Sequence, residues 1–410
     1  MFENLINQDA GSRLTSDINK NILPRALLFS GENSSGKFTA ALEVARILTC
    51  GSEEKGNWQC QCASCIQSKS LLTKNLMVMG PRDCSLEIAA AKKAFLKATG
   101  SNEQYLDSAR YLFLRSIRKL TLRFNGILWK GEPNLSKIGT LMEEINENLE
   151  QLDFPRELPE FQKLEKICNK LTDLTLKLEN DFLYDSIPIN QIRNMEEWAH
   201  IKTEDGKKTI IIENADRMLP GVRNALLKIL EEPPADCVFI LLTSKRNGIM
   251  QTILSRVRTY NFITRDKNIQ QDIVKRIFHE DNFNGSIYDY LLTYLPIPPK
   301  EIEEQADIFF KGIASRQIPE ISSIVKKCDN FNPRMELKLF LKYLMDKQKP
   351  LMKTQQGCEF CVQSTSLFRQ CIDNVTLYNQ TPSSALEILL RDFSTLNVQN
   401  GGILKTCVDM

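Results

Sequence analysis

The sequence predicts an α/β protein whose N-terminal half holds a parallel sheet and whose C-terminal half is helical. Three observations predict this class. Short apolar runs are followed by polar turns and then by helical patterns, which is typical of buried parallel strands. A glycine-rich loop stands between one such run and a helix. No strand pattern of comparable strength follows Phe262, where the chain turns helical.

Length and charge limit the class of protein further. A chain of 410 residues is long enough for two or three domains. Its 53 Lys and Arg against 51 Asp and Glu give a net charge of +2, so no overall basic field attracts nucleic acid. No run approaches the roughly 18 apolar residues of a membrane span. The first residues are polar and acidic, unlike a signal peptide. We therefore expect a cytoplasmic protein with reduced cysteines.

The first strand leads into a phosphate-binding loop. Residues 26–30 are the apolar run Ala-Leu-Leu-Phe-Ser, and residues 31–37 follow as G-x-x-x-x-G-K before a helix with one apolar face. Gly31 and Gly36 allow backbone N–H groups to surround phosphate oxygens, and Lys37 adds a positive charge. This order of strand, loop and helix predicts a P-loop; a plain glycine-rich turn is the alternative.

The residue after the lysine departs from the P-loop pattern. A Ser or Thr hydroxyl at this position holds the magnesium ion, but here it is Phe38. Thr39 lies one residue further on, and a helical rotation of about 100° aims it elsewhere. We therefore expect ATP and magnesium binding to be weak or absent.

A second departure follows the strand at residues 210–212. Glu213 and Asn214 stand where a hydrolysing P-loop protein carries Asp and Glu. Glu213 could reach a metal through its longer side chain, whereas Asn214 cannot accept a proton as a general base. Thr243, at the end of the strand at 238–242, faces the same edge of the sheet. The pattern favours little or no ATPase activity over an active ATPase.

Ser255 and Arg256 follow a short helical pattern at residues 249–254. An arginine in this place can contact the γ-phosphate of a nucleotide held by a neighbouring subunit, which enhances hydrolysis by roughly 10³–10⁵ where it has been measured. The alternative is a surface arginine in a salt bridge, and spacing alone favours that alternative.

Four segments resemble bacterial DNA polymerase III clamp-loader subunits of the delta-prime and gamma/tau type, which are AAA+ proteins. They are residues 1–6 (MFENLI), 23–31 (LPRALLFSG), 224–234 (NALLKILEEPP) and 253–256 (ILSR). The resemblance covers roughly residues 1–81 and 187–262. In this family the motor subunits keep an intact P-loop and Asp-Glu, whereas delta-prime subunits lose them and keep the arginine. Phe38 and Asn214 place the chain with the second group, and Val257 replaces the usual cysteine after the arginine.

Four cysteines just after the P-loop helix predict a structural zinc site. Cys50, Cys60, Cys62 and Cys65 lie within sixteen residues, and four thiolates suit tetrahedral zinc. The resemblance implies a zinc module at this point. The spacing of one residue between Cys60 and Cys62 departs from the usual two and could distort the site. Cys358 and Cys361 have no second pair nearby, so we interpret them as ordinary thiols.

Residues from about 83 to 185 interrupt the family pattern. Apolar residues recur at helical spacing in three segments, 106–124, 135–149 and 161–178, which predicts a helical hairpin or a three-helix extension packed on the rim of the core. The first segment has a basic face, which we interpret as a solvated helix face, with DNA phosphates as the alternative partner. The basic residues are Arg110, Arg115, Arg118, Lys119 and Arg123.

The predicted domains are an AAA+ core at 1–262, a small helical lid at 263–300 and a helical collar at 301–410. The core includes the zinc module at about 50–65 and the insertion at 83–185. The resemblance implies an accessory subunit of a hetero-pentameric clamp loader, with gamma/tau motor subunits, a delta subunit, the sliding clamp and the phosphates of primed DNA as partners. An ATP-hydrolysing motor subunit and a repair-associated adaptor of the same fold are the alternatives.

Overall fold

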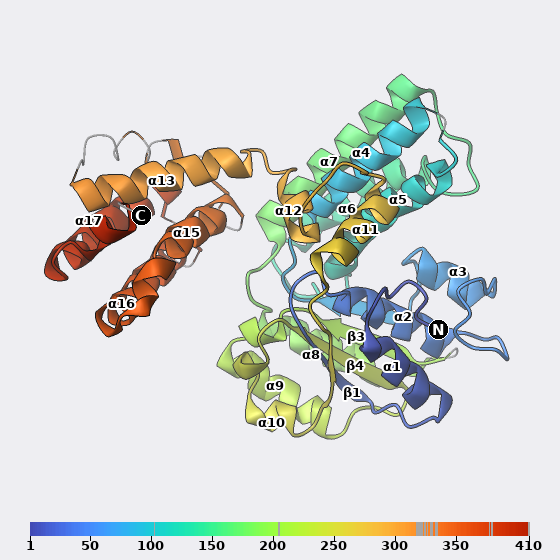
Figure 1. Cartoon of the computed structure of the whole chain (residues 1–410). Coiled ribbons are helices and arrows are strands. Elements are labelled where there is room, and N and C mark those ends of the chain that lie inside the picture. Colours follow the sequence, from blue (N-terminus) through green and yellow to red (C-terminus); the bar gives the residue numbers. More distant parts are fainter. Residues whose placement is uncertain are drawn as a thin grey trace. The chain divides into compact units, whose positions relative to one another are not determined.

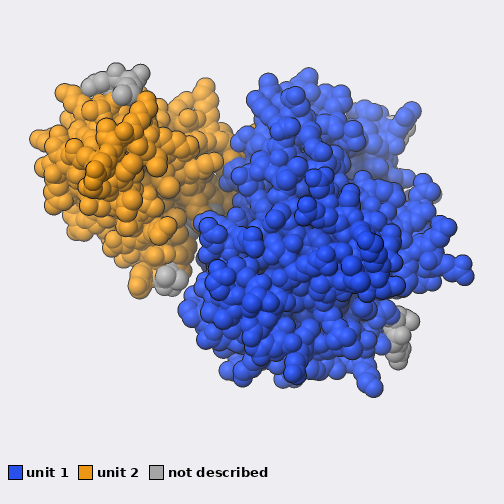
Figure 2. Space-filling model, turned by 60° about the horizontal axis from the view of Figure 1, so that its bottom comes forward, with its two compact units in different colours: residues 1–291 blue, residues 292–410 orange. Residues whose placement is uncertain are grey.

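The structure is a computed structural model that describes residues 1–101, 103–203, 206–316, 323, 325, 327–328, 331–332, 335–376, 378 and 380–408. The chain divides into two compact units, Met1–Leu291 and Leu292–Met410 (Figure 2). The predicted domain boundaries at 262 and 300 stay predictions, because this division into two units does not test them.

The first unit is built on a five-stranded parallel sheet with the order β2-β3-β4-β1-β5 (Figure 1). The strands are β1 Ala26–Ser30, β2 Leu76–Met79, β3 Lys208–Ile212, β4 Cys237–Thr243 and β5 Arg258–Asn261. The predicted α/β class is confirmed, and β1, β3 and β4 match the strands predicted at residues 26–30, 210–212 and 238–242. The fifth strand, β5, is not evident from the sequence, because it lies at the sheet edge and only Tyr260 among its residues is fully buried.

Alternating side chains divide the sheet into two faces. Leu27 and Phe29 pack with α1 (Asp9–Asn19) and α2 (Lys37–Thr49) in one apolar cluster. Ala26 and Leu28 face the opposite side, where α8, α9 and α10 supply the apolar partners. These three helices are Ile189–His200, Pro220–Glu231 and Gln251–Leu254. The sheet is therefore the middle of three layers, and its strands are buried on both faces, as their apolar runs predict.

The insertion consists of four helices rather than the three predicted. The predicted segments correspond to α5 (Leu106–Thr121), α6 (Leu135–Glu150) and α7 (Phe161–Phe182), with the 3₁₀ turn η1 (Leu122–Phe124) after α5. The additional helix is α4 (Ser85–Gly100), which packs against α5 and α7. Its sequence, SLEIAAAKKAFLKATG, is rich in alanine and shows only a weak apolar periodicity.

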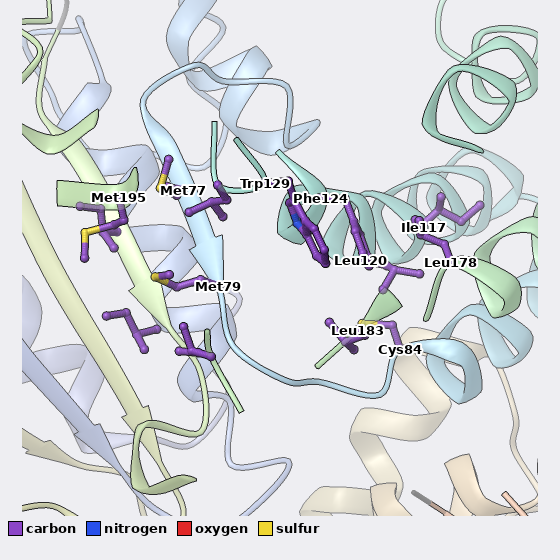
Figure 3. Close-up of a cluster of buried hydrophobic side chains, with 14 of the residues drawn as sticks. Met77, Met79, Cys84, Ile117, Leu120, Phe124, Trp129, Leu178, Leu183 and Met195 are labelled. Carbon is purple, nitrogen blue, oxygen red and sulfur yellow. The ribbon is translucent and has the colours of Figure 1, made fainter. Parts of the chain in front are cut away.

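The insertion shares its core with the sheet and does not merely rest on the rim of the domain. Its apolar side chains belong to the same buried cluster as those of β2, β3 and β4. Figure 3 shows Phe124 and Trp129 between the methionines of β2 and the apolar face of α5, near Leu120. The expectation of an extension packed on the rim is therefore wrong.

The basic face of α5 is neither solvated nor free to meet DNA. Arg110, Arg118 and Arg123 are buried. Arg110 donates hydrogen bonds to the carbonyl oxygens of residues 152, 153 and 156. Arg118 pairs with Asp153. These arginines therefore bond to groups inside the protein, and both interpretations of the face are wrong for them.

Three shorter helices complete the first unit, and the last of them ends one residue beyond its boundary. The cysteine group is followed by α3 (Ala63–Lys69), and β5 by α11 (Lys267–Phe278) and α12 (Ile287–Leu292). The region after Phe262 is therefore helical where it is described, as predicted. Among the described helices, none has both the length and the apolar character needed to cross a membrane.

The second unit is helical throughout its described residues. Its main helices are α13 (Pro299–Ser315), α15 (Glu336–Lys347), α16 (Gln355–Thr376) and α17 (Pro382–Gln399). The short turns η5 (Lys349–Lys353) and η6 (Ile403–Cys407) pack among them. The buried Asn397 ties this unit together, since its side chain bonds Ile313 and Leu404 backbone groups from separate elements. The described elements of this unit are helical, as predicted for residues 301–410.

Candidate nucleotide and metal sites

The loop after β1 has the backbone form that a P-loop requires. Gly36 has a φ of 93°, which side chains other than hydrogen disfavour, and it directly precedes the first residue of α2. A Cβ atom on Gly31 would lie 2.4 Å from the carbonyl oxygen of Phe262, so the end of β5 also requires glycine here. The fold therefore places the loop at the carboxyl end of the sheet, beside the N-terminus of α2.

Lys37 lies across this loop and bonds to it. Its ammonium donates to the carbonyl oxygens of Gly31 and Glu32, each at 2.5 Å, and to Ser35 Oγ at 3.3 Å. Burial, and then the positive charge of Arg82, lower the pKa of Lys37 to about 8. An anion that entered the loop would have to compete with these carbonyl groups for the lysine.

Two arginines, Arg82 and Arg123, hold the carboxylate of Glu213, the residue predicted to face a metal, and we call them the arginine pair. Arg82 Nη1 donates to Glu213 Oε1 at 3.0 Å, and Arg123 Nη2 pairs with Glu213 Oε2. Both guanidinium groups also lie over the ring of Phe38, at 4.8 Å and 5.5 Å from its centroid. Phe38 stands where a P-loop carries the magnesium-binding hydroxyl. It thus packs against the two arginines that neutralise Glu213.

Further charges hold the arginine pair in place. Glu87 accepts from Arg82 Nη2 at 3.1 Å and pairs with Lys119. Burial alone would raise the pKa of Glu87, but Lys119 and Arg82 outweigh burial and lower this pKa to about 2. Arg123 also donates to the carbonyl oxygens of Gly80 and Lys119. The site is therefore a closed network of paired charges.

The remaining predicted positions lie at the same edge of the sheet. Asn214 takes a left-handed backbone conformation (φ 51°), and its Nδ2 donates to the carbonyl oxygen of Pro81 at 2.5 Å. Thr243 Oγ1 donates to Asp216 Oδ1 at 2.6 Å. Thr39 is half-buried, and none of the hydrogen bonds described for the chain involves its hydroxyl. The fold brings the predicted residues together, but most of their polar groups are already bonded to other groups of the chain.

This arrangement does not support metal-assisted hydrolysis. A magnesium ion needs oxygen ligands in octahedral geometry, whereas both carboxylate oxygens of Glu213 are bonded to guanidinium groups. The adjacent cations would also repel a divalent ion. Asn214 is held by a backbone carbonyl and has no proton-accepting group for activating water. The expectation that Glu213 could reach a metal is therefore not supported by its contacts.

Arg256 lies away from these residues, in the turn between α10 and β5. Its Nη1 donates to the carbonyl oxygen of Thr252 at 2.7 Å, and its Nη2 pairs with Glu231 Oε1 at 2.5 Å. About 32% of the Arg256 side chain and 50% of the Glu231 side chain remain exposed. Arg256 thus forms the salt bridge that was predicted as the alternative. Its guanidinium group nevertheless remains accessible to solvent.

The four predicted cysteines converge. Their sulfur atoms all lie within 4.8 Å of one another, and Cys50 Sγ is 3.8 Å from Cys60 Sγ. A tetrahedral site with metal–sulfur bonds of about 2.3 Å has sulfur–sulfur edges of about 3.8 Å. The one-residue spacing at Cys60 and Cys62 therefore does not prevent a four-thiol site, and the group fits a metal ion of this size.

The thiols of this group differ in acidity. Burial would raise the pKa of Cys62, but hydrogen bonds from the backbone of Cys65 and Gly51 outweigh it and lower this pKa to about 6. Burial raises the pKa of Cys65, and its contacts with Cys50 and Cys62 add to the rise. Among the residues that the structure describes, Cys358 and Cys361 belong to no such group, and their interpretation as ordinary thiols stays a prediction.

Sequence reasoning missed three arginines of the site. Arg82 and Arg123 lie outside every P-loop motif, and their partner Glu213 is 131 and 90 residues away in sequence. Arg265, which is buried, joins the N-terminal segment to the loop by donating to the carbonyl oxygens of Ile6 and Ser34. No sequence spacing marks these contacts, although an arginine next to an apolar strand end was a signal for Arg82.

The sheet order, the P-loop after β1 and the acidic residue after β3 define a P-loop protein of the AAA+ class. The chain also matches the model of a family described as "DNA polymerase III, delta subunit" over residues 6–130 and 155–266, which is more than half of its length. The chain belongs to this family. The predicted resemblance to delta-prime and gamma/tau subunits is thereby confirmed.

Individual relatives match shorter segments. The delta-prime subunit of DNA polymerase III from Bacillus subtilis is 37% identical over 84 residues, which cover 19% of this chain and 26% of the relative. The tau subunit from the same organism is 46% identical over 55 residues, or 13% of this chain and 10% of the relative. The chain thus spans about a quarter or less of these relatives' lengths. The match to a gamma-subunit-related protein from Thermotoga maritima covers 55% of this chain and 90% of that protein, at 16% identity and a TM-score of 0.29.

Proposed function

We propose that the chain is a delta-prime-type subunit of a DNA polymerase III clamp loader that does not hydrolyse ATP itself. The observation that carries this proposal is the arginine pair on Glu213, with Phe38 beneath it. A motor subunit needs a metal ion at this position for each turnover, and two guanidinium groups there oppose its binding. Family membership supports the replicative setting, with gamma/tau motor subunits, a delta subunit, the sliding clamp and primed DNA as partners.

The active contribution of the chain would come from Arg256. Its guanidinium is exposed and lies in a short turn, where a neighbouring subunit can approach. On assembly, it would exchange its pairing with Glu231 for the γ-phosphate of the neighbour's ATP and so stabilise the charge that develops during hydrolysis. DNA would be contacted through its phosphates, without reading of base sequence.

The test uses the reconstituted complex of this chain with the motor and delta subunits, the clamp and primed DNA. Arg256→Ala should leave assembly intact and lower clamp-stimulated and DNA-stimulated ATP turnover, by at least the share of one ATP site. Arg246→Ala, an exposed arginine in the nearby turn η3 (Arg246–Gly248), is the matched control and should leave turnover unchanged. Equal turnover for wild type and Arg256→Ala would contradict the proposed role of the arginine.

The isolated chain tests the absence of hydrolysis. We expect no phosphate release above background from ATP and magnesium at any chain concentration. Sustained turnover that disappears in Lys37→Ala would instead establish the alternative of a motor subunit. A chain that co-purifies with neither the motor subunits nor the clamp would favour the alternative of a repair-associated adaptor.

We further propose that the four-cysteine group holds a structural zinc ion. Four sulfur ligands at tetrahedral separations suit zinc and leave no open position for catalysis. Zinc bound there would cross-link the loop after α2 to α3. Elemental analysis of the purified chain should find one zinc per molecule, and Cys60→Ser should abolish stoichiometric retention. A fully folded chain that contains no metal after growth with added zinc would contradict this assignment.

A further inference from the structure

Arg46, near the end of α2, contacts the cysteine group from behind. Only 2% of its side chain is exposed. On its own helix it pairs with both carboxylate oxygens of Glu43, at 2.9 Å and 2.5 Å. It also donates to the carbonyl oxygens of Gly56 at 3.0 Å and Asn57 at 3.1 Å, in the loop that carries the second and third cysteines. Finally, its Nη1 lies 3.2 Å from Cys65 Sγ.

The other end of the cysteine module faces the insertion. Lys69, the last residue of α3, accepts hydrogen bonds at its carbonyl oxygen from Tyr111 Oη at 2.5 Å and from Arg115 Nη1 at 2.6 Å. Arg118 Nη1 donates to the next carbonyl oxygen, that of Ser70, at 3.3 Å. The last carbonyl groups of a helix lack partners within the helix and carry partial negative charge, so cationic side chains suit them. The basic face of α5 therefore receives the C-terminus of α3.

We propose that Arg46 is a positioning residue for the metal centre, and that the metal-bound module acts as a strut between the P-loop helix α2 and the insertion helix α5. The strut rests on the proposed zinc occupancy and is independent of the role of Arg256. In this role the metal-bound module holds the insertion against the nucleotide-binding core.

A metal ion held by four thiolates carries a formal charge of −2, and an N–H donor with a full positive charge beside one sulfur offsets part of it. Changes to such outer partners typically cost about 10–100-fold in metal affinity. In addition, α3 has only 7 residues, and a helix of this length is not stable in water without external restraints. Without the metal, its C-terminal carbonyl groups would no longer be held in place for α5.

The first experiment compares zinc affinities of the full chain by competition with a chromophoric chelator. Arg46→Lys keeps the charge but cannot reach Glu43, the loop carbonyls and the sulfur together, so we expect at least a 10-fold loss of affinity. Arg110→Lys is the matched control. Arg110 is also buried, donates to backbone carbonyls and lies 4.2 Å over the ring of Phe154, but it contacts no part of the module. The control should retain zinc within about 2-fold of wild type.

The second experiment measures hydrogen exchange of the full chain before and after zinc removal. We expect faster exchange in residues 51–66 and also in α5, with no change in β3 and β4. Tyr111→Phe removes one donor to the carbonyl oxygen of Lys69 while all metal ligands remain. It should accelerate exchange in α5 and leave zinc affinity unchanged, so this variant decides the question even if the Arg46 variant does not fold.

The outcomes separate the hypotheses. Equal zinc affinity for Arg46→Lys and Arg110→Lys would overturn the positioning role of Arg46. Unchanged exchange in α5, after zinc removal and in Tyr111→Phe, would overturn the strut while leaving zinc itself in place. A folded chain without zinc would overturn the zinc assignment and the strut together, and would leave the arginine-donor function untouched.

Discussion

Replacing Arg123 by alanine should expose how strongly the first unit depends on the arginine pair. The Arg123 and Glu213 side chains are 2% and 8% exposed, and their ion pair joins the insertion to the end of β3. Breaking a buried pair by removing one partner costs roughly 3–5 kcal/mol, because the remaining charge stays buried. Arg82 also contacts Glu213, at 3.0 Å, and should keep this contact in the variant. We therefore expect the free energy of unfolding to fall by about 3 kcal/mol, near the lower end of that range.

Urea unfolding followed by tryptophan fluorescence can measure this loss. The chain has 3 tryptophans, and Trp58, Trp129 and Trp198 all lie in the first unit, so the signal reports that unit alone. Lys130→Ala is the control, because it breaks an ion pair with Glu197 whose side chains are 70% and 66% exposed. Exposed pairs of this kind contribute at most about 1 kcal/mol.

A second variant distinguishes charge burial from lost packing. Adding Glu213→Gln to Arg123→Ala removes the buried carboxylate that has lost one of its two cations, so the double variant should be more stable than Arg123→Ala alone. A cost of less than about 1 kcal/mol for Arg123→Ala, or a double variant less stable than the single one, would contradict this expectation. Either result would mean that the ion pair does not hold the insertion on the sheet.

Three further outcomes are expected. Phe38→Thr should restore the magnesium-binding hydroxyl but give no ATP hydrolysis in a phosphate-release assay, since the arginine pair still occupies Glu213; measurable turnover would contradict this. Burial raises the pKa of Glu179 to about 7 from 4.5, so the folded chain holds this proton longer than the unfolded chain, and stability should fall as pH rises from about 4.5 to 7. Glu179→Gln should remove up to about 3 kcal/mol of that fall in urea titrations, and a parallel pH profile in both proteins would refute the assignment. Gly31→Ala should strongly lower the melting temperature, because the added Cβ would lie 2.4 Å from a backbone oxygen. The control is Gly139→Ala in α6, whose Cβ would meet nothing within 4 Å, so this variant should be neutral or stabilising. Similar melting temperatures for the two variants would contradict the close approach at Gly31.

Local patterns predicted the parts of the site that depend on local geometry. The P-loop follows from the spacing of Gly31, Gly36 and Lys37 between a strand and a helix, and the structure has that geometry. The cysteine group follows in the same way, because its ligands lie close together in sequence. Parallel strands place their carboxyl ends at one edge, so Glu213 and Thr243 were expected near the loop.

The contacts that close the site could not be predicted, because their partners are distant in sequence. Arg123 and Glu213 are 90 residues apart, and Arg115 and the carbonyl of Lys69 are 46 apart. A row of arginines on one helix face usually indicates exposure to solvent, and only the fold shows that backbone carbonyls cover it. The helix α4 escaped notice for another reason: its small alanine side chains pack closely without a strong apolar periodicity.

The shared core of sheet and insertion has a practical consequence for anyone who wishes to shorten this chain. Residues 83–185 interrupt the family motifs and look like a cassette that could be cut out and the ends rejoined. In the fold, however, their apolar side chains pack in the same buried cluster as Met77 and Met79 of β2 and help to bury them. Excision would uncover that strand and also remove one of the two cations on Glu213. The segment is an integral part of the domain core. A shortened chain would need new apolar side chains over β2 and a new cation beside Glu213.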